Sequence, residues 1–397
     1  MKKTHLFGTM LLAFGAMVFT ACNNDNPIEL DVNAPYVPGI PMDDIATPNP
    51  ELDLTELNTV IPNLNYTVDD VNGWAVIRLD LTGVKDPYTN DWVKLYGPGS
   101  TQGKQNVWLS LDGKPKGFSL YNTIDDADDK ELSAVDIVFL VDNSGSMGEE
   151  ANAIAEDIKS WADELGGTLD VQFGCVGYDG AITGAINITT ADKLKEYLDY
   201  SSGTGRTYHF GGPDADELKS KVGPYATGGG SWNECGTAAL RFADENFSFR
   251  PGANRVYVNF TDEPNQPGGK ADYSTLWVKE NWKSTQGTIH TIYSDGTWWA
   301  NNYMNYVDKD YPWDLSIYTD GTMLFTSSNF IDINGNRIKL SDLPVSGALL
   351  NSYIIKFTNC EEVFDGQPHN VKITVKSESP NGEILADKEF NMVFNKE

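Results

Sequence analysis

Hydrophobic and polar residues follow different periods in different parts of the chain. Between Gly73 and Leu81 apolar residues occupy every second position, which is typical of a strand with one buried face. Short strand-like runs follow at Trp92–Tyr96, Val107–Leu111 and Gly117–Leu120, separated by Gly, Pro and Asp turns. Residues 60–130 are therefore predicted to form a β-rich segment.

From residue 133 the pattern changes to alternating strands and helices. Val135–Val141 is continuously apolar except for Asp136, as expected of a parallel strand covered on both faces. Glu149–Leu165 then carries apolar residues at helical spacing and ends at a pair of glycines. Later elements are predicted as strands at Leu169–Tyr178, Arg255–Phe260, Thr288–Tyr293 and Gly321–Thr326 and helices at Ala191–Tyr200, Asp214–Val222, Asn233–Phe242 and Leu340–Leu350. This alternation predicts an α/β fold, with an open, mostly parallel sheet and helices on both faces.

Strand patterns return at the end of the chain, at Tyr353–Phe357, Val371–Val375 and Lys388–Val393. Three strands are too few to make a stable independent sandwich. We therefore expect residues 353–397 to complete the sheets begun by residues 60–130. The α/β domain, residues 131–352, is then inserted in or flanked by a β-sandwich.

The first 22 residues read as a targeting segment. Two lysines precede an apolar stretch, Leu6–Phe19, that is too short to span a membrane comfortably. Phe19-Thr20-Ala21-Cys22 resembles a bacterial lipobox, with Phe19 where such boxes usually carry Leu. The resemblance implies that Cys22 is lipidated and anchors the protein to the bacterial outer membrane or cell surface; a plain secretory signal is the alternative. Residues 23–59, rich in Asn, Asp and Pro, are predicted to form a tether.

Net charge limits the possible partners, and the cysteine count limits the possible disulfides. The net charge of −28 argues against nucleic acid as a partner, because the excess of acidic groups would repel the phosphates. Cys175, Cys235 and Cys360 remain beyond Cys22, and an odd count gives no disulfide framework. A Cys175–Cys235 disulfide within the α/β domain and buried free thiols are both open readings.

Polar residues follow two of the predicted strands where each ends. Asp142-Asn143-Ser144-Gly145-Ser146 comes directly after Val135–Val141, and Asp262 follows Arg255–Phe260. Sites in open α/β sheets form beyond the carboxyl ends of strands, at the point where the strand order reverses. Carboxylate and hydroxyl oxygens are ligands of hard divalent cations. These positions predict a cation site, and the alternative is a polar turn with a helix cap.

Another loop, residues 228–234, lies between these two in sequence and precedes a predicted helix. Its three glycines permit sharp turns that let Ser231 or Glu234 reach inward.

The pentapeptide Asp142–Ser146 resembles the DxSxS signature of the von Willebrand factor A (VWA) domain. Ser231 stands where that family usually has a metal-bound Thr, and Thr261-Asp262 is similar to the family's third loop. The resemblance covers residues 133–350 and implies a dinucleotide-binding-like fold with a metal-ion-dependent adhesion site. In such a site Mg²⁺, or alternatively Mn²⁺ or Ca²⁺, accepts an acidic residue from a protein ligand. The ligands it implies are Asp142, Ser144, Ser146, Ser231 and Asp262.

Two further stretches are similar to the integrin β-subunit I-like domain. Ser146-Met147-Gly148-Glu149-Glu150 resembles the integrin segment whose two acids serve a second, neighbouring cation. This implies a second site at Glu149 and Glu150, although acids in the first turn of a helix are also favoured by the helix dipole. Glu234-Cys235-Gly236 resembles the integrin segment that supplies a carboxylate to the primary site, which adds Glu234 to the metal ligands.

Aromatic residues gather after the strand Thr288–Tyr293, beginning with Trp298 and Trp299. This position places them on the same rim as the metal loops, where they would contact a ligand. Packing of a long loop is the alternative explanation.

No arrangement of residues typical of an enzyme is apparent, whether a Ser-His-Asp order, a paired-His zinc motif or a phosphate-cradling loop. The sequence therefore predicts a non-enzymatic lipoprotein with a cation-dependent module for adhesion or protein–protein interaction. The alternatives are a component of envelope or fimbrial assembly and a metal-dependent hydrolase.

Overall fold

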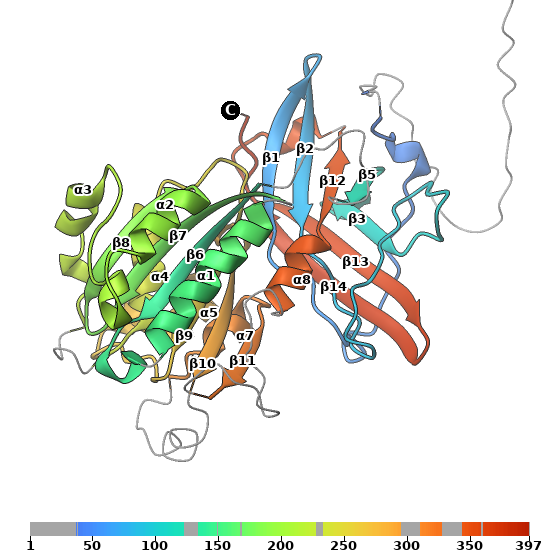
Figure 1. Ribbon diagram of the computed structural model, residues 1–397. Coiled ribbons are helices and arrows are strands. Elements are labelled where there is room, and N and C mark those ends of the chain that lie inside the picture. Colours follow the sequence, from blue (N-terminus) through green and yellow to red (C-terminus); the bar gives the residue numbers. More distant parts are fainter. Residues whose placement is uncertain are drawn as a thin grey trace, which may run out of the picture.

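The computed structural model describes residues 37, 39–122, 134–148, 150–166, 169–227, 233–294, 310–327, 344–358 and 360–396. They form one six-stranded sheet and two four-stranded sheets (Figure 1). The large sheet carries helices on both faces, and the two smaller sheets pack together as a sandwich beside it. The predicted fold class, an α/β domain associated with a β-sandwich, is confirmed.

The six-stranded sheet has the order β11-β10-β9-β6-β7-β8. Its strands are β6 (Ala134–Asp142), β7 (Asp170–Tyr178), β8 (Ile182–Thr189), β9 (Asn254–Thr261), β10 (Thr288–Ser294) and β11 (Met323–Thr326). Neighbouring strands are parallel except β7 and β8, which are antiparallel. The chain builds outward from β6 on one side through β7 and β8, then returns to β9 on the other side. The strand order therefore reverses between β6 and β9, where such sheets place their sites.

Helices cover both faces of this sheet because successive residues of its strands point to opposite sides. The helices are α1 (Glu150–Gly166), α2 (Ala191–Leu198), α3 (Ala215–Ser220), α4 (Gly236–Asn246), α5 (Thr275–Asn281), α7 (Asp314–Tyr318) and α8 (Pro344–Leu350). Phe139 of β6 packs in the core under α1, α2 and α8. Its neighbour Leu140 packs in the opposite core, with α3, α4, α5 and α7.

The sandwich combines strands from both ends of the chain. One sheet has the order β1 (Asn65–Val71), β2 (Trp74–Leu81), β12 (Tyr353–Phe357) and β5 (Ser119–Asn122), and the other β14 (Gly382–Met392), β13 (His369–Ser379), β3 (Val107–Leu111) and β4 (Lys114–Pro115). Tyr353 at the start of β12 pairs with Asn122 at the end of β5. The α/β domain is thus inserted between two adjacent antiparallel strands of one sheet.

Hydrogen bonds join the α/β domain to the sandwich. Asn65 donates through its backbone N to Asn254 Oδ1 at 3.0 Å and through Nδ2 to the Ala253 carbonyl at 2.9 Å. The backbone N of Gly83 donates to the carbonyl of Ala348 on α8 at 2.9 Å. These bonds attach both the sheet and the last helix of the α/β domain to the sandwich.

The tether predicted for residues 23–59 is wrong for residues 39–59, which pack against the sandwich. Asp43 pairs with the buried ammonium of Lys116 at 3.1 Å, and Asn49 Nδ2 donates to Thr374 Oγ1 at 2.9 Å. Proline-rich composition suggested an extended linker, but polar side chains tie this extended segment down. Cys22 and the predicted targeting segment lie outside the described residues. Within the described part of the chain, no helix is both long and apolar enough to cross a membrane.

Some local predictions also differ from the structure. Trp92–Tyr96 is irregular, with a single bridge between Lys85 and Trp92 in place of a strand. The strand β8 was not predicted, because Gly184 interrupts its apolar pattern. A Cβ at Gly184 would lie 2.2 Å from the carbonyl of His209, so the close approach of a neighbouring segment requires glycine there. β1, α5 and α7 were likewise not predicted.

The three cysteines of the described chain are buried free thiols. Cys175 packs in the core under α1 and Cys235 in the core on the opposite face of the sheet. The disulfide considered for this pair is therefore absent.

The amino-terminal end of β6 contains a buried ion pair. Asp136 is fully buried and accepts hydrogen bonds from the backbone N and the Nε of Arg250, both at 2.7 Å. Arg250 also pairs with Asp170 at 2.7 Å. Burial raises the pKa of Asp136, so its charge depends on this guanidinium.

We predict that Arg250→Met lowers the free energy of unfolding by about 3 kcal/mol at neutral pH, because it leaves the Asp136 carboxylate buried without its counter-ion. Urea unfolding would measure the change. Lys193→Met, which breaks an exposed pair with Glu196, is the control and should cost less than about 0.5 kcal/mol. Equal losses in the two variants would contradict the role given to the Asp136 pair.

Candidate metal centre

The carboxylate of Asp142 is the innermost group of the candidate site. It lies at the carboxyl end of β6 and is fully buried. Its Oδ1 accepts the backbone N–H of Ser144 at 2.9 Å, which turns the chain sharply after the strand. Its Oδ2 accepts the hydroxyl of Thr261, at the end of β9, at 2.8 Å. The carboxylate is therefore held in a fixed orientation between the two strands at the switch point.

The following turn brings two hydroxyls to the same place. Ser144 Oγ and Ser146 Oγ are 3.0 Å apart, and Ser146 Oγ donates to Asp262 Oδ1 at 3.2 Å. The short 3-10 turn Gly145–Gly148 is anchored by the buried side chain of Met147. Ser146 is exposed to solvent, whereas Asp142, Ser144 and Asp262 are buried. The structure thus brings four of the predicted ligands together, with one side open.

The oxygen spacing fits an octahedral divalent cation. Adjacent ligands of Mg²⁺, each about 2.0–2.1 Å from the ion, lie about 2.9 Å from one another. The separations of 3.0 and 3.2 Å involving Ser146 need only small adjustments to reach this geometry. No cluster of three or more His, Cys, Asp or Glu side chains suited to a metal occurs among the described residues. Hydroxyl groups would therefore supply part of the coordination.

Charge repulsion at this site also favours a cation. Burial, together with the negative charges of Asp262 and Glu234, raises the pKa of Asp142 to about 8. Burial and the charges of Asp262 and Asp179 raise the pKa of Glu234. Because these carboxyl groups oppose one another's ionisation, a positive ion among them would stabilise all of them in the charged form.

The remaining predicted residues occupy different places. Glu234 lies just before α4 and is bonded to the third loop, where Gln266 Nε2 donates to its Oε2 at 3.3 Å. Glu150 is buried, and its Oε1 accepts the hydroxyl of Ser294 at 3.3 Å, so it points into the domain at the end of β10. Ser231, Glu149, Trp298 and Trp299 lie outside the described residues.

Asn265, which the sequence did not single out, holds two of the loops in place. Its Oδ1 accepts the backbone N of Thr237 in the first turn of α4 at 3.0 Å. Its Nδ2 donates to the Tyr273 carbonyl at 2.9 Å and to Asp310 Oδ2 at 2.7 Å. Asn265 therefore links the third loop to the helix that follows Glu234. A polar residue in a proline-containing loop gives no periodic signal, so sequence patterns could not reveal it.

Hydrogen bonds of Asn143 hold the first loop, Asp142–Ser146, in place. Its backbone N donates to the Tyr178 carbonyl at 2.9 Å, and its Nδ2 donates to Thr183 Oγ1 at 2.6 Å and to Thr207 Oγ1 at 3.2 Å. Asn143, between Asp142 and Ser144, therefore has a structural role. Neutral amides fix the loops without adding charge to the site.

Solved structures of low sequence identity resemble part of this chain. No protein-family description and no curated protein matches the chain. An aerotolerance-related membrane protein from Bacteroides fragilis shows 15% identity and a TM-score of 0.31, covering 49% of this chain and 93% of that one. The vWF domain of the type V pili tip protein Mfa5 from Porphyromonas gingivalis shows 10% identity and a TM-score of 0.30, covering 53% and 99%.

The PilB minor pilin from Streptococcus sanguinis shows 12% identity and a TM-score of 0.31, covering 67% of this chain and 73% of that one. At such scores these likenesses carry no argument about function. The fold class rests instead on the strand order of the sheet.

We predict that the stability of the metal-free protein falls as the pH rises from about 4 to about 8. A carboxyl group whose pKa is raised on folding stabilises the fold while it is protonated, below its ordinary pKa of about 3.9. For Asp142 that contribution is lost as the pH rises through about 8. Urea unfolding in chelator across this range would measure the decline, and Asp142→Asn should reduce it. An unchanged pH dependence in Asp142→Asn would contradict the raised pKa.

Proposed function

We propose that this chain is a lipid-anchored protein of the bacterial envelope whose α/β domain binds a protein partner through a divalent cation, in adhesion or protein–protein interaction. One observation carries the proposal. At the switch point of the sheet, Ser146 Oγ lies 3.0 Å from Ser144 Oγ and 3.2 Å from Asp262 Oδ1, spacings close to those of a coordination shell, and the Asp142 carboxylate accepts the backbone N–H of Ser144 beside them. The resemblance of the same residues to a metal-ion-dependent adhesion site supports it.

Charged and neutral residues would have different roles in binding the ion. Asp142 and Asp262 would provide negative charge from the ends of β6 and β9, while Ser144 and Ser146 would provide neutral oxygens. By resemblance, Ser231 would add a further hydroxyl from the second loop. When bound, Mg²⁺ would supply an electrophilic centre for a carboxylate oxygen of the partner. Hydroxyl ligands neutralise little of its charge, which favours capture of an external anion.

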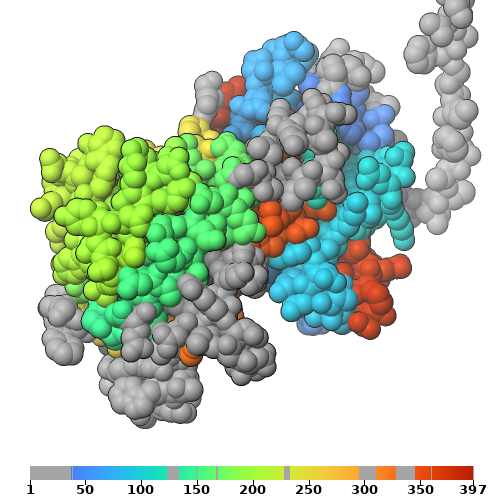
Figure 2. Space-filling model, viewed as in Figure 1, coloured from blue at the N-terminus to red at the C-terminus, as the bar shows by residue number. Residues whose placement is uncertain are grey.

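The position of the N-terminal segment supports display of this site away from an anchor. Residues 39–49 bond to the sandwich through Asp43 and Asn49. Figure 2 shows the sandwich and the α/β domain as two lobes lying next to one another. An anchor at Cys22 would therefore attach through the sandwich and leave the metal loops of the other lobe accessible.

Calorimetric titration of Mg²⁺ and Mn²⁺ into the protein tests whether the site binds a divalent cation. We expect saturable binding with a dissociation constant of about 10⁻⁴–10⁻³ M, the range of weak extracellular oxygen sites. Asp142→Ala should abolish it, because it removes the central carboxylate. Asp192→Ala, which alters an exposed residue of α2, is the matched control and should bind normally. The absence of saturable binding by the wild type up to millimolar ion would overturn the proposal.

Chelator-sensitive crosslinking on whole cells tests whether a protein partner binds through that cation. The wild type should crosslink to a protein partner in Mg²⁺, and both chelator and Asp142→Ala should remove the product. A partner from the envelope itself would indicate the assembly role, whereas an external partner would indicate adhesion. Turnover of glycan or ester substrates that is lost in Asp142→Ala would instead indicate a metal-dependent hydrolase.

We further predict that Asn265→Ala weakens cation binding about tenfold, the loss typical of groups that orient metal ligands. The reason is that the third loop loses its bonds to α4 and Asp310. Asn281→Ala removes an exposed amide on α5 and is the control. The same titration measures both variants, and circular dichroism verifies that each is folded. Unchanged affinity in folded Asn265→Ala would show that the loop is held by other contacts.

A further inference from the structure

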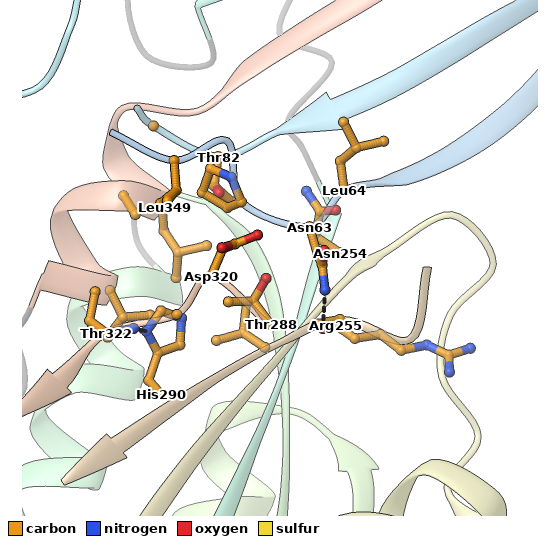
Figure 3. Close-up of a pocket in the computed structure, with 18 of the residues that line it drawn as sticks. Asn63, Leu64, Thr82, Asn254, Arg255, Thr288, His290, Asp320, Thr322 and Leu349 are labelled. Atoms are coloured by element: carbon orange, nitrogen blue, oxygen red, sulfur yellow. Dashed lines mark hydrogen bonds between the residues drawn. The ribbon is translucent and has the colours of Figure 1, made fainter. Parts of the chain in front are cut away.

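A cavity of about 110 Å³ lies between the α/β domain and the sandwich (Figure 3). Its walls come from both domains, with the strands β9 and β10 and the helix α8 on one side and the segments around residues 62–65 and 82–85 on the other. The apolar side chains that line it include Leu64, Trp92, Val256, Val345, Ala348 and Leu349. It lies at the amino-terminal ends of β9 and β10, at the opposite end of these strands from the metal loops.

Most polar side chains around the cavity are already engaged with one another. Asn254 accepts from the backbone N of Asn65 and donates to the Asp80 carbonyl. Asp320 pairs with Lys388 at 2.6 Å, and the same ammonium donates to Asn63 Oδ1 at 2.9 Å. These bonds connect the walls of the cavity. Because Asp320 and Lys388 neutralise each other, their pair adds no net charge to the cavity.

His290 of β10 is the exception. Its Nδ1 lies 2.8 Å from Thr322 Oγ1 and 3.1 Å from the backbone N of Thr322. Because a backbone N–H can only donate, Nδ1 is the accepting, unprotonated nitrogen of the ring. The neutral imidazole therefore carries its proton on Nε2, and the described residues provide no acceptor for that N–H. The side chain is buried with only 7% exposed and lines the cavity (Figure 3). Burial lowers its pKa to about 3, which keeps the ring neutral at physiological pH.

We propose that this cavity binds a small neutral molecule, either one aromatic ring or a short branched aliphatic chain, with one oxygen that accepts a hydrogen bond from His290 Nε2. The apolar walls select the hydrocarbon part, and the Nε2–H of His290 selects the oxygen. An ion of either sign would lose its hydration on entry into these largely apolar walls.

The size of the cavity sets the size of the guest. An engineered apolar cavity of about 150 Å³ binds benzene. A space of about 110 Å³ is smaller, so a single ring with about six or seven non-hydrogen atoms is the upper limit for a guest and requires the walls to move apart slightly. Because the walls belong to two domains, an occupant would contact both and add to the contacts at their junction. Binding to the folded state alone would also raise the unfolding temperature.

Phenol and toluene test the proposal, because they have the same number of non-hydrogen atoms but only phenol carries an oxygen. Titration calorimetry and thermal unfolding of the full chain should show saturable binding of phenol. His290→Leu should weaken phenol binding about three- to tenfold, the effect of one neutral hydrogen bond, and leave toluene binding nearly unchanged. Ala348→Leu fills the space from α8 and should abolish binding of both molecules.

Circular dichroism confirms that each variant is folded, and benzoate serves as the charged probe that should not bind. Three results would each overturn the proposal: no saturable binding of phenol by the wild type, binding that persists in folded Ala348→Leu, or equal weakening of phenol and toluene by His290→Leu. None of these measurements involves a metal, so their outcome is independent of the function proposed for Asp142 and its neighbours.

Discussion

A buried carboxylate at the end of a central strand is the constraint around which the α/β domain is organised. The apolar strand β6 delivers Asp142 into a position with no solvent contact, where each of its oxygens needs a donor. The bond from the backbone N of Ser144 turns the first loop, and the bond from Thr261 ties β9 to β6. The hydrogen bonds that the Asp142 carboxylate accepts therefore set the positions of two of the three loops of the candidate site.

The site is supported mainly by neutral polar groups. Asn143 and Asn265 fix the loops through amide hydrogen bonds, and the hydroxyls of Ser144 and Ser146 lie where a cation would bind. Additional carboxylates would raise the repulsion that already opposes the ionisation of Asp142. With few charges and several oxygens, the proposed site would hold an ion and leave it attractive to an anion from outside.

One sheet of the sandwich is completed by a strand that follows the α/β domain in sequence. The strand β12 follows the last helix of the inserted domain and fills the position between β2 and β5. The ion pair of Asp320 and Lys388 and the contacts of Asn65 close the junction around a largely apolar cavity. Because the chain leaves the sandwich from β5 and returns to it at β12, both connections to the inserted domain start from neighbouring strands.

Sequence patterns were sufficient for the large elements. Periodicity alone located β6, α1, β9, β10 and β12 to within a few residues, because each is a long or strongly apolar segment whose burial governs its conformation. Short elements with a weak pattern were missed. β8 contains a glycine that is required by a neighbour distant in sequence, and residues 39–59 were taken for a tether although their polar side chains bond to the sandwich.

The sequence by itself determined the α/β class, the strand ends that carry Asp142 and Asp262, and the kind of oxygen chemistry available there. Only the tertiary structure decided which of these groups meet. It placed Ser146 against Asp262, directed Glu150 toward Ser294 inside the domain, and revealed Asn265 and His290. The physical reason is that periodicity reports which face of an element is buried, whereas a hydrogen bond between distant loops depends on how separate elements pack.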